Sequence, residues 1–146
     1  GLIKLILPKA KIIDARRNPW DASFSCYKQY FAKGQHFTYD LDDIARYYKD
    51  YIRLMDYWNK LFPGEIFTMH YEQIIDNPDE KISDLLKFCN VEFEESCLNF
   101  HTSKRPVKTA SSEQVRQPMY KSGLDYWKNY SNNLDTLKKH FPNYDK

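Results

Sequence analysis

The sequence is poor in glycine and lacks the cysteine and histidine spacings of metal sites, and each of these absences narrows the range of possible functions. Only four of its 146 residues are glycine, and no G-x-x-x-x-G-K-[ST] pattern occurs, which argues against a nucleotide kinase with a P-loop. The three cysteines form no C-x-x-C pair and the four histidines have no partners at metal-ligand spacing, so we predict no metal site. An odd number of cysteines also favours a reducing compartment, and we predict a cytoplasmic location.

Long hydrophobic runs are also missing. No apolar segment approaches the roughly 18 to 20 residues that a membrane-spanning helix needs, so we predict no membrane span. Aromatic residues, in contrast, are abundant: 12 tyrosines, 9 phenylalanines and 3 tryptophans make up 16% of the sequence. This share indicates a packed core rather than disorder, and the length fits one domain over residues 1–146.

The formal net charge of +2 conceals a strong segregation of charge along the chain. Residues 1–39 contain seven Lys or Arg and two Asp or Glu, residues 40–100 contain six and fourteen, and residues 101–146 contain nine and four. Two basic ends therefore flank an acidic middle, and they can fold together into one positive site for an anion. The charge pattern alone equally allows two solvated basic surfaces, or a module that binds nucleic acid.

Hydrophobic periodicity and helix-capping residues predict an α/β domain. We expect strands over residues 2–7, 11–15 and 65–71, and helices over residues 19–31, 42–61, 79–89, 124–130 and 134–140. Residues 90–119 lack such a pattern and should form a long functional loop. Strands and helices in this order are typical of a parallel sheet, with at least two parallel strands, flanked by helices.

The junction between the strand at residues 11–15 and the helix that follows is a candidate anion site. Asn18 suits the N-cap of that helix and Asp21 its first turn, so an anion would meet unpaired backbone N–H groups there. Arg17 offers a planar guanidinium that can bind two phosphate oxygens, and the hydroxyl of Ser25, eight residues later, can donate to the same group. The plain alternative is that the arginines pair with nearby acids and Ser25 only fills the helix.

Three stretches of the sequence resemble one known family. Arg17-Asn18-Pro19-Trp20-Asp21, followed by Ser25, resembles the 3′-phosphate-binding signature of the sulfotransferases that use 3′-phosphoadenosine 5′-phosphosulfate (PAPS). Residues 69–75, Met-His-Tyr-Glu-Gln-Ile-Ile, resemble the strand-end Tyr-Glu-x-Leu motif of that family. Residues 111–120, which lead to Trp127, are similar to the carboxyl-terminal segment of bacterial and tyrosylprotein sulfotransferases. The three matches follow the family's order, and the resemblance as a whole covers nearly all of residues 11–130.

The resemblance implies cofactor-binding roles for eight residues. Arg17 and Ser25 would hold the 3′-phosphate, and Tyr71 would contact the adenine ring. A segment from residue 114 to residue 122 would fold back over the nucleotide. Its candidate contacts are Gln114, Arg116, Lys121 and Ser122. Ser111, just before this segment, would lie near the phosphosulfate. This segment departs from the family's pattern, because Gln117 stands where tyrosylprotein sulfotransferases carry lysine and Tyr120-Lys121-Ser122 keeps only the lysine of an Arg-Lys-Gly triplet.

The same resemblance implies a P-loop-like sulfotransferase fold and a reaction. A sulfuryl group would pass from PAPS to the hydroxyl or amine of a small-molecule, carbohydrate or peptide acceptor, leaving 3′,5′-adenosine diphosphate, with no nucleic acid and no metal involved. The family takes its phosphosulfate loop and usual base from residues upstream of the 3′-phosphate site, and only sixteen residues precede Arg17. We therefore expect the carboxyl-terminal portion of a sulfotransferase, without the first strand and this loop and with no assigned catalytic residue. The alternatives are a nucleic-acid- or anion-binding module and a non-catalytic nucleotide-binding remnant.

Overall fold

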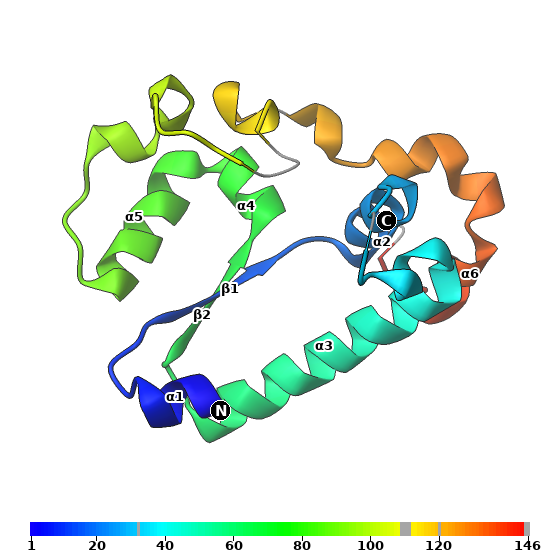
Figure 1. The fold of residues 1–146 in the computed structure, drawn as a ribbon, viewed down its shortest axis with the longest axis horizontal. Helices are drawn as coiled ribbons and strands as arrows, with labels where there is room; N and C mark the ends of the chain where they lie inside the picture. Colours follow the sequence, from blue (N-terminus) through cyan, green and yellow to red (C-terminus); the bar gives the residue numbers. More distant parts are fainter. Residues whose placement is uncertain (32, 109–111, 120, 145–146) are drawn as a thin grey trace.

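A computed structural model describes residues 1–31, 33–108, 112–119 and 121–144. Its α-helices and strands, in chain order, are α1 (Leu2–Ile6), β1 (Ile12–Arg16), α2 (Pro19–Lys28), α3 (Leu41–Leu61), β2 (Ile66–His70), α4 (Tyr71–Asp76), α5 (Pro78–Cys89) and α6 (Asp135–His140). Short 3₁₀ helices are η1 (His36–Tyr39), η2 (Glu95–Cys97), η3 (Phe100–Thr102), η4 (Gln114–Arg116), η5 (Lys121–Gly123) and η6 (Tyr126–Asn133). The chain is an α/β protein in which helices flank a small parallel sheet (Figure 1).

The two strands β1 and β2 pair in parallel, with Ile12 opposite Ile66 and Arg16 opposite His70. This confirms the prediction of parallel strands at residues 11–15 and 65–71. Side chains alternate between the two faces of a strand, and Asp14 is the buried residue of β1, whereas Ile13 on the opposite face is 43% exposed. β1 is therefore less buried than its β-branched sequence predicts.

The strand predicted over residues 2–7 is wrong, because Leu2–Ile6 forms the short helix α1. A helix satisfies its backbone groups locally, whereas a strand needs a neighbour, and none of the described residues pairs with this segment. Lys4 holds the turn that follows α1: its ammonium group donates to the carbonyl oxygen of Pro8 at 2.8 Å and to Glu65 at 2.7 Å.

Side-chain caps set the starts of α2 and α3, and the cap of α2 is the predicted Asn18. The side chain of Asn18 accepts a hydrogen bond from the backbone N–H of Trp20 at the start of α2, and Asp40 caps α3. α3 spans almost the predicted range, while α2 ends at Lys28, three residues before the predicted end. In the described part of residues 90–119, the regular elements are the short 3₁₀ helices η2, η3 and η4. This region crosses from α5 toward α2 (Figure 1).

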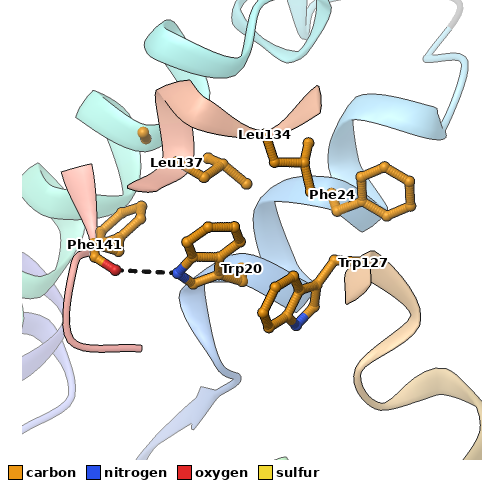
Figure 2. Packing of buried hydrophobic residues seen from close by; sticks show 7 residues of the cluster. Trp20, Phe24, Trp127, Leu134, Leu137 and Phe141 are labelled. Atoms are coloured by element: carbon orange, nitrogen blue, oxygen red, sulfur yellow. Dashed lines mark hydrogen bonds between the residues drawn. The ribbon is translucent and has the colours of Figure 1, made fainter. Parts of the chain in front are cut away.

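The main hydrophobic core lies beside the sheet, between α2, α3 and the carboxyl-terminal helices (Figure 2). It consists of Trp20, Phe24, Ala45, Trp127, Leu134, Leu137 and Phe141. The ring centroids of Trp20 and Trp127 are 4.4 Å apart, and the indole N–H of Trp20 donates to the carbonyl oxygen of Phe141 at 3.2 Å. These contacts fasten the last part of the chain onto α2. Within the described ranges, no helix combines the length and apolar character that a bilayer crossing demands.

Candidate functional site

A cavity of about 570 Å³ opens at the carboxyl ends of β1 and β2. Open α/β sheets bind ligands at this end of their strands, and the volume lies within the usual range for small-molecule sites. Residues from both strand ends, from one face of α2 and from residues 123–126 line the cavity. Arg17, Ser25 and Tyr71, which come from separate parts of the sequence, are all among the lining residues.

Strand register brings Arg17 and Tyr71 together. Arg16 is opposite His70 in the sheet, so Arg17 and Tyr71 are the first residues after two paired strand ends. The guanidinium carbon of Arg17 lies 5.2 Å from the centre of the Tyr71 ring, within the range of a cation–π contact. The two predicted side chains therefore form one wall of the cavity.

The Arg17 guanidinium has only part of its hydrogen-bonding capacity satisfied. One terminal nitrogen donates to the carbonyl oxygen of Gly123 at 2.5 Å and lies 3.8 Å from a carboxylate oxygen of Asp21. Its Nε is buried and has no hydrogen-bond acceptor within the described part of the chain. A buried N–H of this kind normally has an acceptor, so an oxygen-rich anion fits beside Arg17.

Neighbouring elements fix the backbone that carries Arg17. The hydroxyl of Tyr48, on α3, donates to the carbonyl oxygen of Arg17 at 2.5 Å. On the other side, the backbone N–H of Asn18 donates to the carboxylate of Glu72, on α4, at 2.7 Å. Glu72 thus has a structural contact, and the strand-to-helix turn is held by both adjacent helices.

Arg16 is balanced by a neighbouring acid, which is the plain alternative considered above for the arginines. Its Nε and one terminal nitrogen donate to the same oxygen of Asp14, at 3.1 and 2.5 Å. The hydroxyl of Tyr51 donates to the other oxygen of Asp14. Burial, followed by this hydrogen bond, raises the pKa of Tyr51 to about 12, so the phenol remains a donor at neutral pH.

Asp21 lies in the cavity wall and is 5% exposed. Its carboxylate accepts a hydrogen bond from the backbone N–H of Asp125 at 3.2 Å. Burial raises the pKa of this carboxyl group, and the Asp125 N–H and the Arg17 charge oppose the shift only in part. Asp21 therefore partly compensates Arg17 and at the same time ties residues 123–126 to the start of α2.

Ser25 lies two turns along α2 from the junction and faces the same cavity. The side chain is half-buried, and its hydroxyl makes no hydrogen bond to any of the described residues. Arg17, Ser25 and Tyr71 thus converge, as a common ligand would require.

Arg116 and Lys121, two of the predicted carboxyl-terminal contacts, are not among the residues that line this cavity. Arg116 donates to the carbonyl oxygens of Ser103 and Arg105, and Lys121 forms a 3.0 Å ion pair with Asp76. Ser111 lies outside the described residues, and for Gln114 and Ser122 only the backbone is described, in η4 and η5.

Sequence reasoning missed three polar lining residues, Lys28, Gln29 and Tyr126. Lys28 and Gln29 follow Ser25 by three and four positions, a spacing that places helical side chains on one face and could have revealed them. Tyr126 reaches the cavity only through long-range packing of the chain beside Trp127, for which the sequence offers no local signal.

Comparison with known proteins identifies the family. A model of the sulfotransferase family matches residues 1–95, which is well over half of the chain. An uncharacterized protein of Aquifex aeolicus (strain VF5) is 41% identical over 138 residues. That alignment covers 92% of this chain but 18% of the Aquifex protein, so the chain spans less than a fifth of this relative's length. With the Arg17 and Tyr71 motifs inside the matched region, the chain belongs to the sulfotransferase family.

Proposed function

We propose that this chain carries the 3′-phosphate- and adenine-binding part of a PAPS-dependent sulfotransferase. The acceptor of the sulfuryl group would be a hydroxyl or amine on a small molecule, a carbohydrate or a peptide. One observation carries the proposal: Arg17, Ser25 and Tyr71 line a single cavity at the ends of two paired strands. Family membership supports it, because the family implies the use of PAPS.

The side chains in the cavity suit the cofactor that the family implies. The guanidinium of Arg17 and the hydroxyl of Ser25 belong to residues that line the same cavity, and phosphate oxygens are acceptors for both donors. The ring of Tyr71 offers an aromatic surface to a base. When bound, PAPS supplies an activated sulfuryl group on its 5′-phosphate. The residues of this chain would bind and orient the nucleotide, which contributes to catalysis by positioning.

A nucleic-acid-binding module remains the second interpretation of the charge pattern. Such a module binds many phosphates along a broad surface. Its affinity for any polynucleotide falls steeply as the salt concentration rises. The geometry favours a discrete ligand instead, since the three predicted residues line a cavity rather than an open basic face.

Calorimetric titration with 3′,5′-adenosine diphosphate tests the proposal. We expect saturable binding, and we expect Arg17→Ala to weaken it by roughly tenfold or more, because a charge-assisted hydrogen bond contributes about 1.5 to 3 kcal/mol. Arg53→Ala is the matched control, since Arg53 lies on α3, is 84% exposed and pairs with Asp50. Equal weakening by the two substitutions, or binding of single-stranded oligonucleotides in preference to the nucleotide, would contradict the proposal.

A further inference from the structure

The charges that line the cavity are unequally balanced. Four charged side chains line it, namely Arg16, Arg17, Asp21 and Lys28. Arg16 is closely paired with Asp14, and Arg17 lies 3.8 Å from Asp21. Lys28 forms no ion pair with any of the described carboxylates. The uncompensated positive charge of this site therefore comes from Lys28.

Lys28 is also held in place. Its ammonium nitrogen lies 4.3 Å from the centre of the Tyr126 ring, a cation–π contact between the end of α2 and the start of η6. The Tyr126 ring is itself braced, with its centroid 6.1 Å from that of Phe24 and 5.8 Å from that of Tyr130. An aromatic face restrains the cation without neutralising it, so Lys28 keeps its full attraction for an anion.

The position of Lys28 relative to Ser25 indicates which part of a ligand it meets. Lys28 follows Ser25 by three positions on α2, and helical residues at this spacing are neighbours on one face. Both side chains line the cavity, together with Arg17. A phosphate bound by Arg17 and Ser25 would therefore occupy a cavity to which Lys28 adds an uncompensated ammonium group.

We propose that Lys28, restrained by Tyr126, is a specificity residue that makes this cavity prefer a nucleotide with a separate 3′-phosphate. This inference rests on the proposed function, to which it adds a role for Lys28 and a preference between nucleotides. A lysine in the last turn of α2 also interacts favourably with the helix dipole, but that effect concerns stability and does not distinguish between ligands. Ligand preference is therefore the property to measure.

The test compares two nucleotides that carry the same number of phosphates. Affinities for 3′,5′-adenosine diphosphate and adenosine 5′-diphosphate are measured by calorimetry, directly and in competition, at several salt concentrations. We expect Lys28→Ala to lower the affinity for 3′,5′-adenosine diphosphate by roughly five- to tenfold. The affinity for adenosine 5′-diphosphate should fall by less than about twofold. The slope of log affinity against log salt for the first ligand should fall by about one.

Further variants distinguish the role of the Lys28 charge from the role of the Tyr126 ring. Lys28→Arg keeps a cation and Tyr126→Phe keeps the ring, so both should retain the preference for the 3′-phosphate. Tyr126→Leu removes the ring face and should reduce the preference partway toward that of Lys28→Ala. Lys33→Ala is the matched control, because it removes the same charge five residues later from an exposed side chain that does not line the cavity.

Distinct results bear on the two proposals. If Lys28→Ala behaves like Lys33→Ala, or weakens both nucleotides equally, the role of Lys28 is overturned while nucleotide binding by Arg17 stands. If the unmodified protein binds no 3′,5′-adenosine diphosphate, the proposed function fails and the role of Lys28 fails with it. A selective loss with Lys28→Ala, preserved affinity with Lys28→Arg and no loss with Lys33→Ala supports the inference.

Discussion

Tyr48 donates a hydrogen bond to the backbone carbonyl of Arg17, and so α3 holds the turn that presents the Arg17 guanidinium. Burial, and then the neighbouring phenol of Tyr51, raises the pKa of Tyr48 above its ordinary range. The hydroxyl is therefore protonated at neutral pH and can always donate. A residue in the middle of a long helix thus positions a residue at the cavity without lining it.

Removal of this hydroxyl should affect both stability and binding. Tyr48→Phe leaves the Arg17 carbonyl without its donor, and we expect a loss of about 1 kcal/mol in the free energy of unfolding. Nucleotide affinity should fall severalfold, because the turn that carries Arg17 is less restrained. Denaturant unfolding and calorimetric titration measure the two effects. Tyr57→Phe, at a 55% exposed site on the same helix, should change neither, and a similar loss there would contradict the positioning role.

The buried carboxyl group of Asp21 should make stability depend on pH. Burial raises its pKa in the folded state, so the folded protein takes up this proton more readily than the unfolded chain. The stabilising contribution is fully present below the unfolded pKa near 3.8 and is lost as pH rises through the folded pKa. Asp21→Asn keeps an acceptor for the Asp125 N–H but does not titrate. We expect the wild type to lose stability relative to Asp21→Asn as pH rises.

Denaturant unfolding of both proteins across about pH 3 to 7 checks this difference. Asp50→Asn, at an exposed site on α3, should parallel the wild type throughout. A difference between the wild type and Asp21→Asn that stays constant with pH, or grows in favour of the wild type, would contradict the raised pKa.

The core beside α2 should dominate global stability. Leu137 is fully buried among the aromatic side chains of α2 and the chain end, and Leu137→Ala leaves a cavity that costs about 2 to 5 kcal/mol. Leu54 is 51% exposed on α3, and Leu54→Ala should cost no more than about 0.5 kcal/mol. Chemical denaturation of the two variants measures the contrast. Equal losses would place the stabilising core elsewhere than between α2, α3 and α6.

Local chemistry predicted much of this fold. The Asn18 side chain and the proline that follows it specify the start of α2 regardless of what packs around them, and the apolar stripe of α3 specifies a helix in the same way. The apolar run at residues 2–7 has no such signal, because periodicity cannot distinguish a short buried strand from a short helix. Whether residues 2–7 form a strand or a helix depends on whether a neighbouring strand is available to pair with their backbone.

The candidate site was predictable only in part. Arg17, Ser25 and Tyr71 were found because each stands in a motif or at a strand end. Their convergence depends on the register that pairs Arg16 with His70, which local sequence does not specify. Lys28 was missed although it follows Ser25 by three positions, and its contact with Tyr126 depends on the long-range packing of the chain beside Trp127.

Because Arg16 and His70 pair across a long stretch of sequence, we expect the cavity to form late in folding. The turn after β1 contacts α4 through residues 54 positions apart, Asn18 and Glu72, and closing such a crossover is slow compared with forming a helix. No single segment contains the cavity, so an anion that binds there recognises the completed strand pair. By mass action, that anion would stabilise the folded state, which links occupancy of the cavity to the stability of the fold.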